Sequence, residues 1–242
     1  GSDLVVQVKG DQAKRVVPFE NEDVNACWIT DQDRWSYEGL NSEDRLQTPM
    51  IKGDDNVWRE ASWNDALTAA AQALGRINET QGIGQIGALA TEYATVEELA
   101  LLGRLVRGLG SEHIDFRLRQ NDASFEAALN GVPWLGMPIA ELNNLDRVLV
   151  VGSSLRKDHP LFAQRLRQAA KQGAQIVFID SFGDNPLFPL AARLTVAPSQ
   201  LAATLVKLGN ALAGQKEGAQ ADEKDPVQKI AAILASGSNS AV

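Results

Sequence analysis

The stretch "DRVLVVGSSLRKDHPLFAQRLRQAAKQGAQIVFID", residues 146–180, holds two uninterrupted apolar runs on either side of a segment with helical spacing. The runs DRVLVVGS (146–153) and AQIVFID (174–180) are typical of strands that are buried on both faces. HPLFAQRLRQAAKQG (159–173) has a proline in its first turn and a glycine at its end, as helices often do. A strand, a helix and a second strand in this order predict a parallel β-α-β unit.

Similar patterns occur along most of the chain. IGQIGALA (83–90) and ARLTVAP (192–198) are predicted to be further strands. Helices are predicted over TVEELALLGRLVRGLG (95–110), SQLAATLVKLGNAL (199–212) and PVQKIAAILA (226–235). Strands that alternate with helices favour parallel pairing with helices on both faces. The sequence therefore predicts an α/β fold with three layers and a mostly parallel sheet.

A small β element is expected before this α/β region. LVVQVKGDQAKRVVP (4–18) predicts a β-hairpin, because two β-branched runs flank Gly10 and Asp11. The residues that follow have weaker periodicity, and we expect a short helix near 33–39 and a short strand at 57–60.

The pattern changes at Ser62, which has the character of a helix N-cap with Asp65 three residues later. We therefore divide the chain into residues 1–61, a small β element with a wrapping segment, and residues 62–242, the α/β domain. In the helix predicted after Ser62, one face carries the apolar residues Trp63, Leu67, Ala70 and Leu74.

Composition excludes several classes of function. The chain of 242 residues has 23 basic and 31 acidic residues and a net charge of −8. Such an acidic chain lacks the basic footprint of a nucleic-acid binder, and anionic lipid would repel it. No apolar run approaches the roughly 20 residues that cross a bilayer, so we expect no membrane insertion. Cys27 is the only cysteine, which excludes an internal disulfide and agrees with a reducing compartment.

Candidate binding residues follow the two strands of the central unit. Gly152, Ser153, Ser154 and His159 come after the first strand, and Asp180 ends the second. Open α/β sheets bind ligands at the carboxyl ends of their strands, and amides at the start of a helix can receive a phosphate. The chain has neither a G-x-G-x-x-G fingerprint nor a P-loop, however. The plainer alternative is that Gly152 permits a tight turn and Asp180 caps a loop.

Metal binding is not favoured by the residues themselves. His113 and His159 are the only histidines, and neither has a cysteine or histidine at the spacing of a metal site.

The final residues, Ala241 and Val242, have the pattern of a strand that is beginning. We expect the native sequence to continue beyond both ends of the chain.

Several segments of the chain resemble a known family. NEDVNACWITDQDRWSYEGLNSEDRLQTPMIK (21–52), with SWNDAL (62–67) after it, resembles the large iron–sulfur subunit of respiratory complex I. Residues 97–119 and 146–181 are similar to the molybdopterin oxidoreductase domain of that subunit. The resemblance implies a molybdopterin-oxidoreductase-like fold, with residues 1–61 as a remnant of a small β domain of the cluster-binding type.

The resemblance also permits a test of the cofactor sites. Relatives of this type hold a [4Fe–4S] cluster on four cysteines, and Thr30 stands at the position of the last one; Cys27 is three residues early. We expect Cys27 to be a small buried thiol. Arg119 stands near the position of the molybdenum or tungsten ligand, with Ser124 nearby. We therefore expect no metal and no cofactor in this chain, and iron–sulfur clusters in native sequence that precedes it.

The pattern GSSLRKDHP (152–160) matches the family's nucleotide-contacting motif only in part, with Ser154 at a position where asparagine helps to hold the pterin nucleotide. Gly152, Ser153, Ser154, His159 and Asp180 would then be relics of that pocket.

The resemblance implies a non-catalytic scaffold portion of the large iron–sulfur subunit of NADH:quinone oxidoreductase. Its partners would be other subunits of the peripheral arm, and its location cytoplasmic, held at the inner membrane through the complex. Two alternatives remain open: a fragment of an active molybdenum or tungsten bis-pterin enzyme such as a formate dehydrogenase, and a free-standing nucleotide-binding module. A scaffold needs interfaces, so we expect exposed apolar residues within 19–61. Trp28, Trp35 and Tyr37 are expected to bury area against the α/β body or against a preceding cluster domain.

Overall fold

The computed structural model describes residues 2–118, 129–216 and 224–242. They belong to two compact units: Gly1–Ser42 together with Trp134–Val242, and Glu43–Pro133. The domain boundary expected between residues 61 and 62 coincides with neither border of these units. The boundary between residues 61 and 62 therefore stays a prediction.

The first unit contains a sheet of four strands in the order β10-β7-β8-β9, in which every neighbouring pair is parallel. The strands are β7 (Arg147–Val151), β8 (Gln175–Asp180), β9 (Ala192–Thr195) and β10 (Ser240–Ala241). β7 and β8 are the two apolar runs of the central stretch, so the predicted parallel unit is confirmed. β10 pairs with β7, as the strand pattern at the end of the chain suggested.

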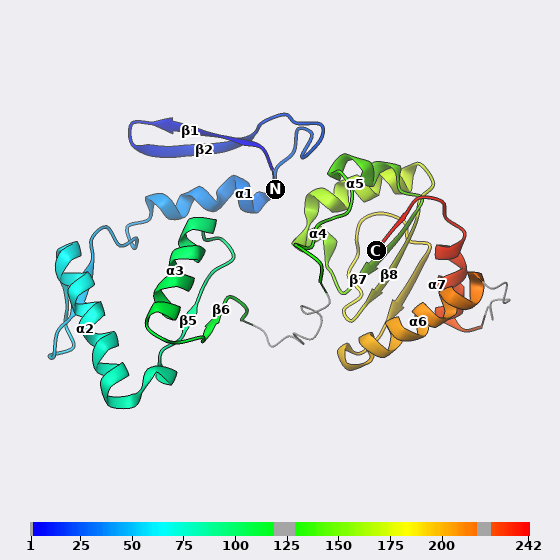
Figure 1. Cartoon of the computed structure of the whole chain (residues 1–242). Coiled ribbons are helices and arrows are strands. Elements are labelled where there is room, and N and C mark those ends of the chain that lie inside the picture. Colours follow the sequence, from blue (N-terminus) through cyan, green and yellow to red (C-terminus); the bar gives the residue numbers. More distant parts are fainter. Residues whose placement is uncertain (1, 119–128, 217–223) are drawn as a thin grey trace. The chain divides into compact units, whose positions relative to one another are not determined.

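Helices cover both faces of this sheet (Figure 1). One face carries α5 (Pro160–Lys171), and the other carries α6 (Leu201–Lys216) and α7 (Pro226–Ala235). The short helix α4 (Leu155–Asp158) leads into α5. The arrangement confirms the three-layer α/β fold.

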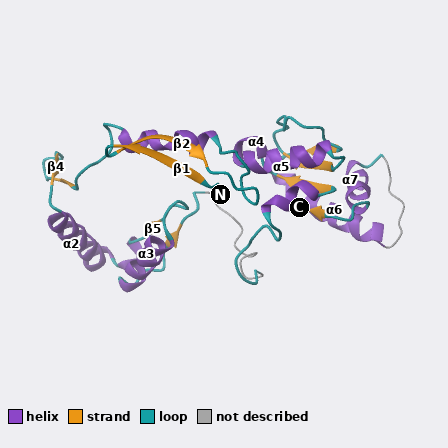
Figure 2. Ribbon diagram, turned by 90° about the horizontal axis from the view of Figure 1, so that it is seen from above, coloured by secondary structure: helices purple, strands orange, loops and turns teal. Residues whose placement is uncertain are grey.

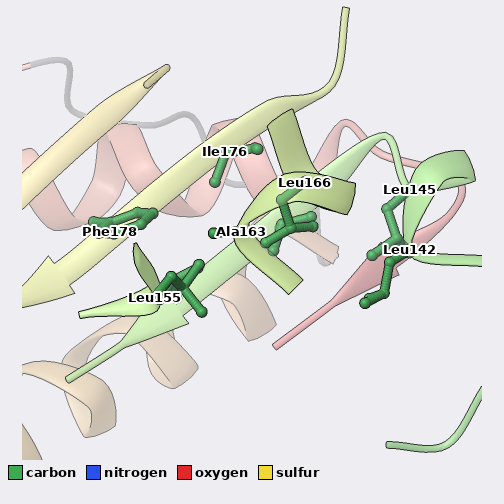
Figure 3. Close-up of a cluster of buried hydrophobic side chains, with 9 residues drawn as sticks. Leu142, Leu145, Leu155, Ala163, Leu166, Ile176 and Phe178 are labelled. Carbon is green, nitrogen blue, oxygen red and sulfur yellow. The ribbon is translucent and has the colours of Figure 1, made fainter. Parts of the chain in front are cut away.

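Two apolar cores result from the alternation of side chains along the buried strands. In β8, Ile176 and Phe178 point toward the α5 face, whereas Val177 and Ile179 point toward α6 and α7. All four are fully buried. The α5-side core also contains Leu142, Leu145, Val148, Val150, Leu155, Ala163 and Leu166 (Figure 3). Leu142 comes from the 3-10 helix Ile139–Asn144.

Asp146 fastens the last strand to the sheet. Its Oδ2 accepts hydrogen bonds from the N–H and the hydroxyl of Ser238, both at 2.8 Å, and from the N–H of Asn239 at 3.2 Å. These bonds, led by the one from the Ser238 N–H, hold the pKa of Asp146 below its ordinary value. The Arg147 Nε donates to the Ile233 carbonyl at 3.0 Å and ties the end of α7 to β7.

The N-terminal part of the first unit is a hairpin packed on a helix (Figure 2). β1 (Leu4–Lys9) and β2 (Gln12–Pro18) pair antiparallel around Gly10, which has a φ of +61°. This confirms the predicted hairpin and its turn. β2 contacts α1 (Asp31–Trp35) and the 3-10 helix Ser36–Asn41. This helical segment begins slightly earlier than the short helix expected near 33–39.

The loop before α1 is closed by two buried polar side chains. The Asn25 amide donates to the Phe19 and Trp28 carbonyls at 3.0 Å, and its oxygen accepts from the Asp3 N–H at 2.9 Å. Arg165, which is 7% exposed, donates from α5 to the carbonyls of residues 22 and 24, at 2.7 and 3.1 Å. Asn25 and Arg165 together hold the loop against the sheet unit.

The described residues of the second unit include two small strand pairs and two α-helices. β3 (Met50–Lys52) pairs antiparallel with β4 (Trp58–Glu60), and β5 (Ala88–Leu89) pairs parallel with β6 (Ile114–Asp115). The strand predicted over 83–90 is therefore largely wrong. Its first part is the 3-10 helix Ile83–Gln85, a consequence of Gly82, Gly84 and Gly87 interrupting the extended pattern.

The helices of the second unit begin where the sequence predicts. α2 (Trp63–Gln81) starts after Ser62, whose hydroxyl accepts from the Asp65 N–H at 3.1 Å. α3 (Val96–Gly108) starts with a full capping box between Thr95 and Glu98. α2 buries no residue, and Trp63 and Leu67 are 72% and 64% exposed. The helix itself is as predicted, and the described residues leave its apolar face largely uncovered. No helix in the described residues has the length and apolarity to cross a membrane.

Candidate functional site

The candidate residues from β7 and β8 meet at the carboxyl ends of these strands. Gly152 follows β7 with a φ of +63°, a conformation that disfavours any side chain. Its N–H donates to the Ile179 carbonyl at 2.9 Å, so the turn stays bonded to β8. The tight-turn interpretation of Gly152 therefore agrees with its geometry.

Ser153 and Ser154 are engaged by neighbouring carboxylates. The Ser154 N–H donates to Asp158 Oδ2 at 2.9 Å, and the Ser153 hydroxyl donates to the same oxygen at 3.4 Å. The Ser154 hydroxyl donates to Asp184 Oδ2. The donors that would face a phosphate at this helix start are thus bonded within the protein.

Asp180 ends β8 and is fully buried. Its Oδ1 accepts from the Gly183 N–H at 3.0 Å and from the Thr195 hydroxyl at 3.3 Å. Its Oδ2 lies 3.2 Å from the Arg193 Nε. The loop-capping interpretation of Asp180 agrees with the bond to Gly183, but the carboxylate also has a charged partner from the next strand.

Arg193 links this carboxylate to the loop after β8. Its Nη1 donates to the Asp184 carbonyl at 2.5 Å, and its Nη2 lies 3.7 Å from Asp184 Oδ1. The guanidinium also lies over the Phe178 ring, with 5.0 Å between the guanidinium carbon and the ring centroid. We call Ser154, Asp180, Asp184 and Arg193 the strand-end cluster.

His159 is not part of this cluster. Its ring packs against Phe162 with a centroid distance of 5.8 Å, and its side chain makes no capping hydrogen bond to α5. Its N–H donates to the Leu155 carbonyl at 2.9 Å, which ends α4.

Sequence reasoning missed Asp158, Asp184 and Arg193. A signal for one of them was present: Arg193 is a charged residue inside an apolar run that predicts a buried strand. Such a residue needs a buried partner of opposite charge. Asp184 and Asp158 lie in loops, where carboxylates are common and single out no partner.

The residues do not fit an iron–sulfur cluster. The Thr30 hydroxyl caps α1 by accepting from the Asp33 N–H at 3.0 Å, which is a local structural role. A [4Fe–4S] cluster needs four thiolates, and the chain has one cysteine. In the parts of the chain that the structure describes, no three His, Cys, Asp or Glu side chains are grouped to hold a metal ion.

Cys27 is exposed, so the prediction of a buried thiol is wrong. The preceding Ala26 has a φ of +50°, and the amide of Asn25 fills the loop interior with hydrogen bonds. The interior of the loop is therefore polar and occupied, and the thiol turns outward.

The strand ends do not fit a pterin nucleotide either. The backbone and hydroxyl donors of Ser153 and Ser154 are bonded to Asp158 and Asp184, and a diphosphate would meet these carboxylates first. Arg119 and Ser124, considered for the metal-ligand position, lie outside the described residues.

The expectation of exposed apolar residues within 19–61 is confirmed. Large side chains there are more than half exposed: Phe19, Trp28, Trp35, Leu40, Leu46 and Trp58. Trp28 and Trp35, at 55% and 54%, are not buried against the α/β body, and burial by a preceding domain stays a prediction for them. In the second unit an open, mostly apolar hollow of about 610 Å³ is lined by Leu46, Gln47, Thr48, Pro49, Met50, Trp58 and Trp63.

Known proteins match this chain both in sequence and in fold. Residues 45–237 match the molybdopterin oxidoreductase family, and residues 1–38 match the NADH-ubiquinone oxidoreductase NDSU1/NuoG-like, 4Fe-4S domain. The solved structure of acetylene hydratase from Pelobacter acetylenicus matches 98% of this chain and 37% of its own, with a TM-score of 0.68 and 16% identity. At that identity the likeness establishes the fold alone.

Sequence relatives narrow the assignment. A subunit of the NADH-quinone oxidoreductase of Rickettsia felis is 30% identical over 188 residues, which are 78% of this chain and 27% of the relative. The mitochondrial NADH-ubiquinone oxidoreductase 78 kDa subunit of Candida albicans is 32% identical over 170 residues, 69% of this chain and 23% of the relative. The chain thus spans about a quarter of the length of these curated relatives. The chain belongs to the molybdopterin oxidoreductase family and, within it, to the type found in the large subunit of respiratory complex I.

Proposed function

We propose that this chain is a non-catalytic scaffold portion of the large iron–sulfur subunit of NADH:quinone oxidoreductase. In this role it supplies a folded α/β body and apolar surface to an assembly. Electron transfer then takes place in other parts of the subunit and in its partners, which are subunits of the peripheral arm at the cytoplasmic side of the membrane.

The observation that carries the proposal is the state of the strand-end cluster. In an open parallel sheet this edge is where a ligand binds. Here the Asp180 carboxylate faces Arg193, and the Ser154 hydroxyl is bonded to Asp184. A family member whose binding edge is filled by its own side chains retains the architecture without the means to hold the family's cofactor.

Exposed apolar side chains support the scaffold role independently. Trp58 and Trp63 are 59% and 72% exposed and line the same hollow. Large aromatic residues are enriched at the centres of protein interfaces, where they contribute much of the binding energy. A monomer that works alone rarely exposes such residues together.

Assembly is tested by coexpression of the tagged chain with the other subunits of the complex from the same organism. We expect the chain to copurify with them, and Trp58→Ser combined with Trp63→Ser to reduce the recovered subunits by roughly tenfold or more, since interface aromatics often contribute about 2 kcal/mol. Val206→Ser is the control, because Val206 is an apolar residue, 65% exposed on α6, that does not line the hollow. Equal recovery for both variants would contradict an interface at the tryptophans.

The competing function is that of an active molybdenum or tungsten enzyme, which the family membership keeps open. It is separated by metal analysis of the native protein that contains this chain, purified from cells supplied with both metals. We expect neither metal in stoichiometric amount. One molybdenum or tungsten per protein would overturn the proposed function.

A further inference from the structure

We infer that Arg193 bridges Asp180 and Asp184 at the carboxyl ends of the strands, so that an internal ion-pair cluster occupies the position where this sheet would otherwise take a phosphate ligand. The inference concerns the chain itself and goes beyond its proposed place in an assembly. A failure of the chain to copurify with other subunits would leave it intact.

The cluster joins two neighbouring strands and the loop that connects them, together with a more distant turn. Arg193 comes from β9, Asp180 from the end of β8, and Asp184 from the loop between these strands. Ser154, from the turn after β7, adds the third strand end through its bond to Asp184. The contacts therefore fix the edge of the sheet at which a ligand would enter.

The members of the cluster are largely buried and are held to one another by charge: Asp180 Oδ2, Asp184 Oδ1 and the Nε and Nη2 of Arg193 have no hydrogen-bond partner among the described residues. The Asp180 side chain is 1% exposed, and those of Arg193 and Asp184 are 23% and 20% exposed. A buried carboxylate needs a partner, because an uncompensated charge is costly in a poorly solvated site. Arg193 meets this need, and the Phe178 ring beneath its guanidinium restricts where that group can lie.

Charge also opposes an anionic ligand at this edge. Asp158 and Asp184 place two carboxylates directly on the turn through their bonds to Ser153 and Ser154, and the guanidinium of Arg193 is paired with Asp180 and Asp184. A diphosphate would have to break the bonds of Ser154 to Asp158 and Asp184 and would then face their negative charges. The arginine that could attract a phosphate is already held by two carboxylates.

A double-mutant cycle in urea unfolding tests the bridge, with the 242-residue chain as the starting protein. We expect Arg193→Met and Asp184→Asn each to raise the equilibrium constant of unfolding. For the double variant we expect this constant to be roughly 3- to 100-fold smaller than the product of the two single effects predicts. Additivity within about twofold would overturn the bridge. Arg167→Met is the matched control, because Arg167 is an exposed arginine on α5 and should be additive with Asp184→Asn.

Titration of the wild-type chain with GDP, alone and with magnesium, provides a measurement that does not depend on the variants. We expect no saturable heat at about 1 mM nucleotide. Saturable binding that Arg193→Met abolishes would overturn the inference, since the arginine would then be free to hold phosphate. If Arg193→Met does not fold, Arg193→Lys takes its place in the cycle, because it keeps the positive charge. We then expect Arg193→Lys to retain more stability than Asp184→Asn does.

Discussion

The helices α5 and α2 have the same amphipathic character, but they differ in what covers them. α5 has 12 residues and buries Ala163, Arg165, Leu166 and Ala169 against the sheet. α2 has 19 residues and buries none. An apolar stripe specifies which face of a helix must be covered, but not which molecule covers it. The sheet covers α5, whereas the described residues of the second unit supply no equivalent cover for the apolar side chains of α2.

The two units therefore differ in where their stability originates. β7 and β8 are buried on both sides by helices of their own unit, so the sheet unit contains its own core. The Glu43–Pro133 unit buries Ile86 and Val106 but leaves Trp58, Trp63 and Leu67 mostly exposed. Such a unit gains little from its large apolar residues until a partner removes them from water.

Truncation of one large aromatic in each unit gives the largest expected contrast. Phe178 is fully buried between the sheet and α5, so Phe178→Ala should lower the free energy of unfolding by about 3–5 kcal/mol. Trp63→Ala, at a position 72% exposed, should change it by less than about 0.5 kcal/mol. Urea unfolding followed by circular dichroism measures both. A loss of several kcal/mol for Trp63→Ala would show that α2 is already covered in the isolated chain.

The same contrast explains what could be predicted from the sequence. β7, α5 and β8 lie in one continuous stretch: the two strands are uninterrupted apolar runs, and the helix between them has a proline in its first turn and a glycine at its end. The hairpin and the caps at Ser62 and Thr95 are likewise local signals, and all of them are present in the structure. Local signals predict elements well because the interactions that produce them lie within a few residues.

Nonlocal features were predicted less well. The contact of Arg193 with Asp184 depends on the path of the loop between β8 and β9, and the bond of Ser154 to Asp184 spans 30 positions, which no local pattern encodes. Cys27 was assigned by its residue type, although the neighbouring Asn25 decides which side chain enters the loop. The run 83–90 has strand composition, but its glycines leave only Ala88–Leu89 in a ladder.

A pair of glycines sharpens the comparison with smaller effects. A β-carbon at Gly237 would collide with Arg147 Cγ and lie 2.7 Å from Asp146 Oδ1, where β10 joins the sheet. Gly237→Ala should therefore destabilise the sheet unit by about 1–2 kcal/mol. Gly75→Ala, inside α2 with no atom within 4 Å of the new carbon, should stabilise α2 by up to about 1 kcal/mol. Urea unfolding of both variants checks the opposite signs, and destabilisation by Gly75→Ala would mean that this face of α2 is in contact with something.

The smallest expected effects concern two carboxylates with lowered pKa values, one in each unit. Asp146 is bonded to Ser238, 92 positions away, whereas Asp55 pairs with Arg59 four positions away. In the folded protein the Ser238 N–H lowers the pKa of the Asp146 carboxyl group, and the Arg59 guanidinium lowers the pKa of the Asp55 carboxyl group. A lowered pKa contributes stability that is present above the unfolded value of about 3.9 and is lost as the pH falls through the folded value.

Asp146→Asn should therefore reduce the urea midpoint at pH 6, and its difference from the wild type should shrink as the pH is lowered below about 4. Asp55→Asn should change the midpoint less at every pH, because Asp55 and Arg59 are half-exposed and their pair holds only a local turn. Added salt should weaken the Asp55 effect further by screening. An Asp146→Asn difference that stays constant from pH 6 to about 2.5 would contradict a role for its charge. No difference at any pH would show instead that the hydrogen bonds that survive in asparagine are sufficient to hold β10 on the sheet.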